Sequence, residues 1–250
     1  MNSEPFSYKV LDHGYVKLIP KGTWGSDETI IESARMSTDG GFVSWDPYPG
    51  HPKGDQGLLS FLWNHKHMTP FEMAGATFEI QAPIMVFREW HRHRTQSYNE
   101  MSGRYTELPN LYYIPSVERL MAGKQSQTNH QSSQDGFTEA DAFRLRGDLI
   151  YATQKSREAY QRLLEVGLSR ELARLVIPVN QYSRMRASAN LRNWLGFLTL
   201  RLDPASQWEI RQYAEAVASV IAKLFPRTWK LFNSDRQGLS GISCGNSKEK

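Results

Sequence analysis

The pattern of residues in the segment 76–105 changes from that of a strand to that of a helix and then to that of a polar loop. These two changes constrain the fold more than any other part of the chain. Apolar and polar residues alternate over 76–82, which predicts a strand with one buried face. Pro83 then suits the first residue of a helix over 84–93, because its fixed φ and missing N–H are tolerated there. The helix leads into a polar run that we expect to be an irregular loop.

That polar run, RHRTQSYNEMSGRY at 92–105, concentrates groups that bind ligands. It holds three arginines, a histidine, a glutamate, an asparagine and several hydroxyl groups. Arginine presents a planar fork of donors that grips paired oxygens, which the single ammonium of lysine does not. The run therefore predicts a site for a ligand with several anionic groups. Taken alone, it also fits a solvated helix end whose arginines interact with the helix dipole.

The rest of the pattern predicts one α+β domain with a mixed or antiparallel sheet and several packed helices. Strands are expected at 8–19, as a hairpin turning at 12–14, and at 179–187; helices are expected at 26–37, 58–67, 139–165, 171–176, 190–202 and 206–225. Residues 38–57 should be loop, and 122–136 a polar surface insertion. We expect this domain to occupy residues 1–235, followed by a polar C-terminal tail at 236–250.

Composition and charge make several classes of function unexpected for this chain. The net charge is only +4, and basic and acidic residues mix without a basic tail, so we expect no nucleic-acid partner. No apolar run reaches membrane-spanning length and no signal peptide is evident, which favours the cytoplasm, or a host's cytoplasm if the gene is viral. The single cysteine, Cys244, excludes an intramolecular disulfide, and nothing near it in sequence would lower its pKa. Thiolate catalysis is therefore not expected.

Four spaced segments together resemble the flavin-dependent thymidylate synthases. Residues 92–94 and Ser102 match the R-H-R-x7-S signature, and 97–105 match its S-Y-N-E-x-S-x-R-Y run. HMTPFE at 67–72 resembles the upstream H-x-T-P-F-E segment. Arg174, the pair Asn190 and Arg192, and Arg201 follow in the family's order and approximate spacing. The likeness covers roughly residues 8–230.

The resemblance implies a fold, a reaction and an assembly. Members of this family methylate dUMP at C5 to form dTMP, with methylenetetrahydrofolate as carbon donor, FAD as hydride carrier and NADPH as reductant. No enzyme thiolate need attack the pyrimidine, which agrees with the absence of a usable cysteine. The resemblance also implies a homotetramer with active sites at subunit interfaces, where Thr69 or Ser102 would serve a neighbouring chain.

Position by position, the resemblance implies a substrate set and a cofactor set that share Arg92 and Glu100. Arg201 is the expected catalytic residue, polarising the uracil and favouring ionisation at N3. The dUMP set is Glu89, Arg92, Glu100, Ser102, Gly103, Arg104, Arg174 and Arg201. The FAD set is Thr69, Arg92, His93, Arg94, Glu100, Asn190, Arg192 and Gly196. No metal ligand is expected.

Two positions depart from the family pattern, and both bear on the flavin. Gly196 stands where relatives often carry histidine or asparagine, and Ala205 stands where they carry histidine. Both positions lie near the flavin in relatives, so the resemblance implies an altered cofactor environment in this chain.

Other interpretations stay open at this point. The same fold could support a pyrimidine-nucleotide hydroxymethylase or a dCMP-specific enzyme, and the arginine cluster could belong to a non-catalytic nucleotide or RNA binder. The H-x-H pairs at 65–67 and 91–93 invite a zinc site. Residues i and i+2 point about 200° apart on a helix, and the cationic neighbours would repel a metal, which argues against zinc.

Overall fold

A five-stranded antiparallel sheet forms the centre of the molecule. The computed structural model describes residues 6–127 and 133–240, so Cys244 lies outside the described residues. The strands follow the order β1-β2-β3-β7-β4 across the sheet. They are β1 (Ser7–Val10), β2 (Gly14–Leu18), β3 (Gly75–Pro83), β4 (Ser97–Glu100) and β7 (Tyr182–Asn190). The predicted α+β class with an antiparallel sheet is confirmed.

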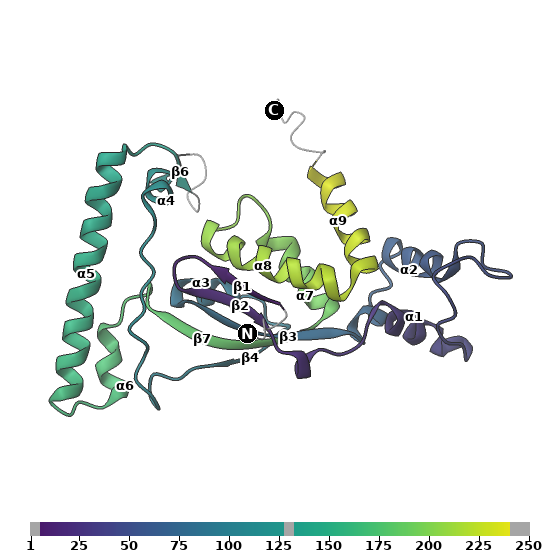
Figure 1. Cartoon of the computed structure of the whole chain (residues 1–250), viewed down its shortest axis with the longest axis horizontal. Coiled ribbons are helices and arrows are strands. Elements are labelled where there is room, and N and C mark those ends of the chain that lie inside the picture. The colour runs from purple at the N-terminus through teal and green to yellow at the C-terminus, as the bar shows by residue number, and fades with distance from the viewer. Residues whose placement is uncertain (1–5, 128–132, 241–250) are drawn as a thin grey trace, which may run out of the picture.

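Helices gather on one side of this sheet and at its two ends. They are α1 (Asp27–Arg35), α2 (Gly54–Asn64), α3 (Ile84–Trp90), α4 (Val117–Met121), α5 (Glu139–Glu165), α6 (Arg170–Ala173), α7 (Leu191–Arg201), α8 (Trp208–Leu224) and α9 (Pro226–Ser240). In Figure 1, α7 and α8 lie above the strands, α1 and α2 lie at one end, and the long α5 stands apart at the other. Within 6–127 and 133–240, no helix is long and apolar enough to cross a membrane.

Alternation along the strands decides which face of the sheet is buried. Phe78 and Ile80 of β3 are fully buried under the helices, and burying a side chain of this size stabilises the fold by about 1.5–3 kcal/mol. The alternate residues of β3 point to the opposite, polar face. There Glu79 accepts a hydrogen bond from the Tyr15 hydroxyl at 3.0 Å and lies 3.5 Å from the guanidinium of Arg186. One face therefore carries the core and the other carries paired polar groups.

An aromatic cluster joins α3 to α7 beneath the site residues. The rings of Trp90 and Phe197 stack with centroids 4.6 Å apart, and Phe78 meets Trp194 edge-on at 4.9 Å. Both tryptophans are fully buried, and each indole N–H has a partner: Trp90 donates to Gln96 Oε1 at 3.0 Å, and Trp194 donates to the Ala76 carbonyl at 2.9 Å. The C-terminal half of α3 is thereby fixed against α7.

Several boundaries differ from those expected, and tertiary contacts explain the most important one. Residues 97–100 form β4 instead of loop, because their backbone pairs with β7 at the edge of the sheet. A local pattern of polar residues carries no sign of such pairing. Helix α2 begins at Gly54, four residues before the expected start at Leu58, and the 122–136 insertion contains a short hairpin, β5 (Lys124–Gln125) with β6 (Ser133–Gln134).

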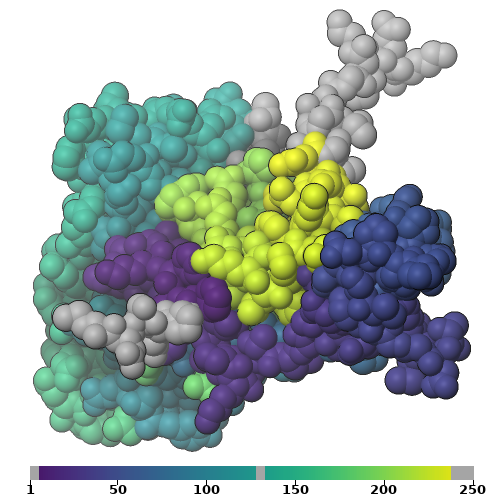
Figure 2. Space-filling view, turned by 45° about the vertical axis from the view of Figure 1, so that its right-hand side comes forward, coloured from purple at the N-terminus to yellow at the C-terminus, as the bar shows by residue number. Residues whose placement is uncertain are grey.

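Helix α9 has no counterpart among the expected elements, and it extends to Ser240, into the region assigned to the polar tail. Its N-terminus is capped from outside. The buried carboxylate of Asp27 accepts hydrogen bonds from the backbone N–H groups of Arg227, at 2.8 Å, and Thr228, at 3.2 Å, and from the Thr228 hydroxyl at 2.6 Å. Figure 2 shows α9 lying against the α1–α2 end of the molecule. Burial raises the pKa of Asp27.

Replacing Asp27 by alanine should lower the free energy of unfolding by about 2 kcal/mol, because two helix N–H groups and a buried hydroxyl lose their acceptor. Denaturant titration measures the change. Glu32→Ala, an exposed position on the same helix, is the matched control and should leave stability within about 0.5 kcal/mol. Equal stability of the two variants would contradict the capping role.

Candidate active site

Arg201, the last residue of α7, is held at three points by α3 and the turn that follows it. Its Nη1 donates to Glu89 Oε2 at 2.9 Å, its Nη2 donates to the Glu89 carbonyl at 3.1 Å, and its Nε donates to Nε2 of His93 at 2.8 Å. The side chain is only 15% exposed. The expected catalytic arginine thus shares one cluster with a residue of each expected ligand set.

His93 is restrained by two aromatic neighbours as well as by Arg201. Its ring meets the edge of Phe197 with centroids 4.8 Å apart, and its carbonyl accepts a hydrogen bond from the Tyr98 hydroxyl at 2.7 Å. Burial, and then the positive charge of Arg201, lower the pKa of His93 to about 4. The imidazole is therefore neutral near pH 7.

The turn after α3 is tied to the N-terminal end of α7. Asn193 donates from its side-chain amide to the Thr95 carbonyl at 3.0 Å, and its backbone N–H is capped by Asn190 Oδ1 at 3.0 Å. Arg92 and Arg94 in this turn are exposed. Within 6–127 and 133–240, no carboxylate lies at ion-pair distance from either guanidinium, so both keep donors for an anionic ligand.

Four other residues of the FAD set lie on or beside the first half of α7: Thr69, Asn190, Arg192 and Gly196. Thr69 begins the short 3-10 helix η3 (Thr69–Glu72), and Glu72 at its end pairs with Arg192 at 2.5 Å. Gly196 lies one turn beyond Arg192, and a Cβ atom added there would meet nothing within 4 Å. This side of α7 is therefore open to a ligand, and the missing side chain at Gly196 enlarges that opening.

The Ser102–Arg104 part of the motif contacts α6 through Arg104. The Ser102 hydroxyl accepts a hydrogen bond from the backbone N–H of Arg104 at 3.3 Å, and Gly103 is buried against Leu108. The Arg104 guanidinium pairs with Glu171 of α6 at 3.1 Å, with both side chains more than half exposed. Arg174 follows in the next turn, exposed and with no carboxylate partner among the residues that the structure describes.

Strand β4 lies in the sequence between the 92–94 turn and the Ser102–Arg104 segment. Thr95 lies beside Asn193 at one end, whereas the Met101 N–H donates to the Arg184 carbonyl near the other end of β7. Four of the six residues between Thr95 and Ser102, Ser97–Glu100, form the strand. Glu100 lies between the groups, exposed on β4 opposite Met185. Within one described chain, the predicted site residues therefore fall into two groups that share no hydrogen bond or ion pair: those around Arg201 and α7, and Ser102–Arg104 with Arg174.

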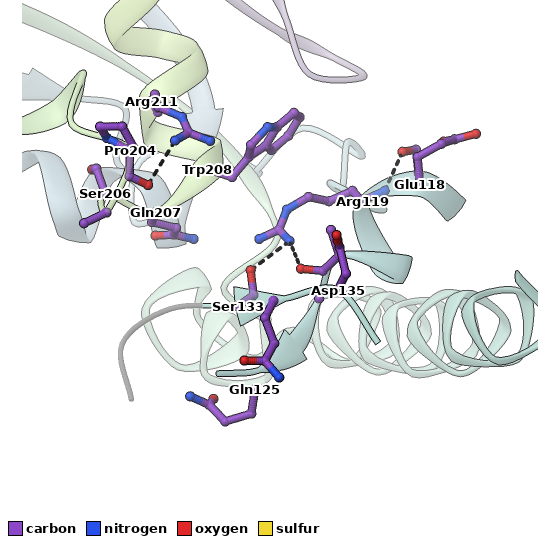
Figure 3. A pocket seen from close by; sticks show the side chains of 15 residues that line it. Glu118, Arg119, Gln125, Ser133, Asp135, Pro204, Ser206, Gln207, Trp208 and Arg211 are labelled. Atoms are coloured by element: carbon purple, nitrogen blue, oxygen red, sulfur yellow. Dashed lines mark hydrogen bonds between the residues drawn. The ribbon is translucent and has the colours of Figure 1, made fainter. Parts of the chain in front are cut away.

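Ala205, the second departing position, lies in a different place. It lines a cavity of about 830 Å³ between α4 with its hairpin and the start of α8 (Figure 3). Arg119 lies over the ring of Trp208 at 5.6 Å and forms a 2.8 Å ion pair with the buried Glu209. None of the residues expected to contact dUMP or FAD lines this cavity.

The histidine pairs do not form a common site. His91 packs edge-on against Tyr98 with centroids 4.9 Å apart, whereas His93 faces Arg201. In the described part of the chain, no three His, Cys, Asp or Glu side chains come together as metal ligands.

Three residues that shape this site were not singled out from the sequence: Tyr98, Asn193 and Phe197. Tyr98 lies inside the matched S-Y-N-E run, and Asn193 lies three residues after the matched Asn190, so their positions carried a signal. Their contacts with the carbonyls of His93 and Thr95 depend on the packing of separate elements and have no local sequence signature.

The His93 imidazole should titrate near pH 4, which an NMR pH titration of its ring resonances measures. The folded state binds this proton more weakly than the unfolded chain, so the free energy of unfolding should fall as pH falls from 6.5 towards 4. His93→Gln removes the titrating group, so the free energy of unfolding of this variant should fall less between pH 6.5 and pH 4. Denaturant titrations at the two pH values measure the difference. A His93 pKa at or above 6.5 would contradict the geometry.

Comparison with known proteins identifies the family of the chain. The family model described as thymidylate synthase complementing protein matches residues 18–227. The flavin-dependent thymidylate synthase of Thermus thermophilus is 39% identical over 228 residues, covering 91% of this chain and 78% of that protein. The enzyme of the same name from Thermosipho africanus is 36% identical over 226 residues, covering 90% and 93%.

A solved structure shares the fold. The UMP/dUMP methylase PolB from Streptomyces cacaoi, bound with 5-Br dUMP, matches with a TM-score of 0.77 and 32% sequence identity, covering 91% of this chain and 97% of that one. The resemblance found in the motifs is thus confirmed over most of the chain. The protein belongs to the thymidylate synthase complementing protein family, together with the flavin-dependent thymidylate synthases.

Proposed function

We propose that the protein is a flavin-dependent thymidylate synthase that methylates dUMP to dTMP. The main structural support is the state of the Arg201 guanidinium. It is largely buried and fixed by Glu89 and His93, and it lies beside the turn that holds the exposed Arg92 and Arg94. Family membership and the dUMP methylase neighbour give the reaction type. A hydroxymethylase of the same fold is not favoured by these relatives.

Arg201 would act on the uracil ring. A cation that is fixed before the reaction and shielded from water stabilises negative charge as it develops on a substrate, without reorganisation at the moment of reaction. Its remaining N–H groups can bind a uracil carbonyl and favour the N3-ionised form. Glu89, in the last turn of α3, and Arg92, two residues after the helix ends, would border this nucleotide.

The open end of α7 suits the flavin cofactor. Arg92 and Arg94 have no carboxylate partners among the described residues, which suits the paired charges of a pyrophosphate. Asn190 and Arg192, with Thr69 of η3 and the clear space beside Gly196, would surround the rest of the cofactor. When bound, FAD supplies the hydride that completes the methyl group. NADPH as reductant and methylenetetrahydrofolate as carbon donor complete the proposed reaction.

We propose that a complete site combines residues of two chains. Ser102, Gly103, Arg104 and Arg174 form no hydrogen bond or ion pair with Arg201, Glu89 or His93 among the residues that the structure describes. Supplied by a neighbour, this second group would add the phosphate-binding cations to the Arg201 group. Glu100, exposed between the two groups, would then approach both ligands. We therefore propose a homotetramer with its active sites between subunits.

The α5–α6 region supports this assembly. Helix α5 has 27 residues, of which only three are buried in the chain. Large apolar side chains of α5 and the segment after α6 face solvent, among them Phe143 at 59%, Tyr151 at 63% and Leu175 at 79% exposure. Exposed apolar residues in such number on one projecting unit are typical of protein–protein interfaces.

The full chain, supplied with FAD, NADPH, methylenetetrahydrofolate and dUMP without oxygen, should bind flavin and form dTMP, identified by mass spectrometry. Arg201→Ala should lower kcat by about 100–1,000-fold while flavin binding persists. Arg211→Ala, an arginine beside the separate cavity, is the control and should keep wild-type turnover. Wild-type protein that binds no flavin and forms no dTMP would refute the proposal. A hydroxymethyl product would identify the alternative, and parallel assays with UMP and dCMP define the substrate.

Complementation between inactive variants tests the two-chain site. Arg201→Ala and Arg104→Ala remove one residue from each group and should each be inactive as pure proteins. Their co-expression should restore activity to about one quarter of the wild-type value, because random mixing leaves that share of interfaces with both groups intact. Co-expressing Arg201→Ala with Glu89→Ala, a variant of the same group, is the control and should restore nothing. Equal activities in the two mixtures would contradict a shared site.

A further inference from the structure

The Nε atom of Arg201 donates to an imidazole nitrogen, where a carboxylate or a carbonyl oxygen is the more usual acceptor. An arginine side chain in a protein remains protonated and only donates. Nε2 of His93 must therefore supply a lone pair, and the ring proton must lie on Nδ1. The 2.8 Å contact thus fixes both the charge and the tautomer of His93.

The surroundings of His93 keep the ring in this state. The edge contact with Phe197 fixes the plane of the ring, and the Tyr98 hydroxyl fixes the backbone of the same residue through its carbonyl. Burial and the neighbouring guanidinium both oppose protonation of the ring, so its lone pair stays available. His93 is therefore a rigid, neutral acceptor aimed at Arg201.

The remaining contacts of Arg201 leave a defined part of its guanidinium free. Of the five N–H groups of an arginine, one bonds to His93 and two bond to Glu89. Two N–H groups therefore have no acceptor among the residues that the structure describes. Contacts at three separate nitrogens fix the plane of the guanidinium, so those two N–H groups have a fixed direction.

We propose that neutral His93 is a positioning residue that orients Arg201 toward the pyrimidine through its Nε2 lone pair. This role rests on the proposed function of Arg201. A neutral acceptor suits the positioning of Arg201 because Glu89 already balances the guanidinium charge. A second carboxylate in place of His93 would make the cluster net negative. That charge would oppose the formation of an anionic uracil beside it. The imidazole orients the arginine without weakening its field.

Kinetics of paired variants separate this role from direct flavin contact. His93→Phe keeps a ring against Phe197 but removes the acceptor, and should lower kcat by about 10–100-fold with flavin affinity and the dUMP KM changed less than about threefold. His93→Gln can present an amide oxygen to Arg201, and should restore kcat to within about fivefold of wild type. His91→Phe, two residues away and facing Tyr98, is the control and should match wild type.

NMR tests the contact directly, first in the wild-type chain and then in the Arg201→Ala variant. Nitrogen-15 shifts of His93 should show a protonated Nδ1 and an unprotonated Nε2, and Arg201→Ala should raise the pKa of His93. A protonated Nε2, equal kcat losses in His93→Phe and His93→Gln, or losses confined to flavin affinity would each overturn the positioning role. If the wild type forms no dTMP, the proposed function fails. The NMR measurement of the His93 tautomer would still show whether His93 accepts a hydrogen bond from Arg201.

Discussion

The pairing of β3 with β7 is the contact on which the site depends. The two nine-residue strands pair along their whole length in antiparallel register, from Gly75 opposite Asn190 to Pro83 opposite Tyr182. Helix α3 leaves β3 at one end of this pair, and α7 leaves β7 at the other end. Both helices fold back over the same buried face, so they run toward each other and their C-terminal ends meet.

The lengths of these elements agree with that meeting point. The seven residues of α3 and the eleven of α7 span about 10 Å and 16 Å, and together they match the length of the strand pair beneath them, about 27–30 Å. Stacking of Trp90 on Phe197 fixes the junction. Arg201 therefore reaches Glu89 and His93 although more than a hundred residues separate them in sequence.

Charge is distributed unevenly around this junction. Arg201 is shielded and compensated by Glu89, whereas Arg92, Arg94 and Arg174 are exposed without carboxylate partners in the described parts of the chain. Unpaired surface arginines suit anionic ligands that bind reversibly, and a shielded arginine suits the stabilisation of charge that develops during a reaction. The proposed division between phosphate binding and uracil activation follows this difference in exposure.

The amino-acid sequence by itself determined the chemistry of the site and most of the fold. The alternation over 76–82 predicted β3 and its buried face, the capping and apolar spacing predicted most of the helices, and the R-H-R-x7-S run with its downstream partners predicted the family. These features are local, or depend on spacing along the chain, so they can be detected in one dimension.

Only the tertiary structure decided how those residues are grouped. Residues 97–100 became β4 because the edge of β7 supplied backbone partners, and Arg104 beyond this strand pairs with Glu171 of α6. The contact between His93 and Arg201, like the cap that Asp27 provides for α9, joins elements far apart in sequence. Such contacts depend on which strands pair and which helices pack together, and the sequence immediately around each residue does not reveal its distant partner.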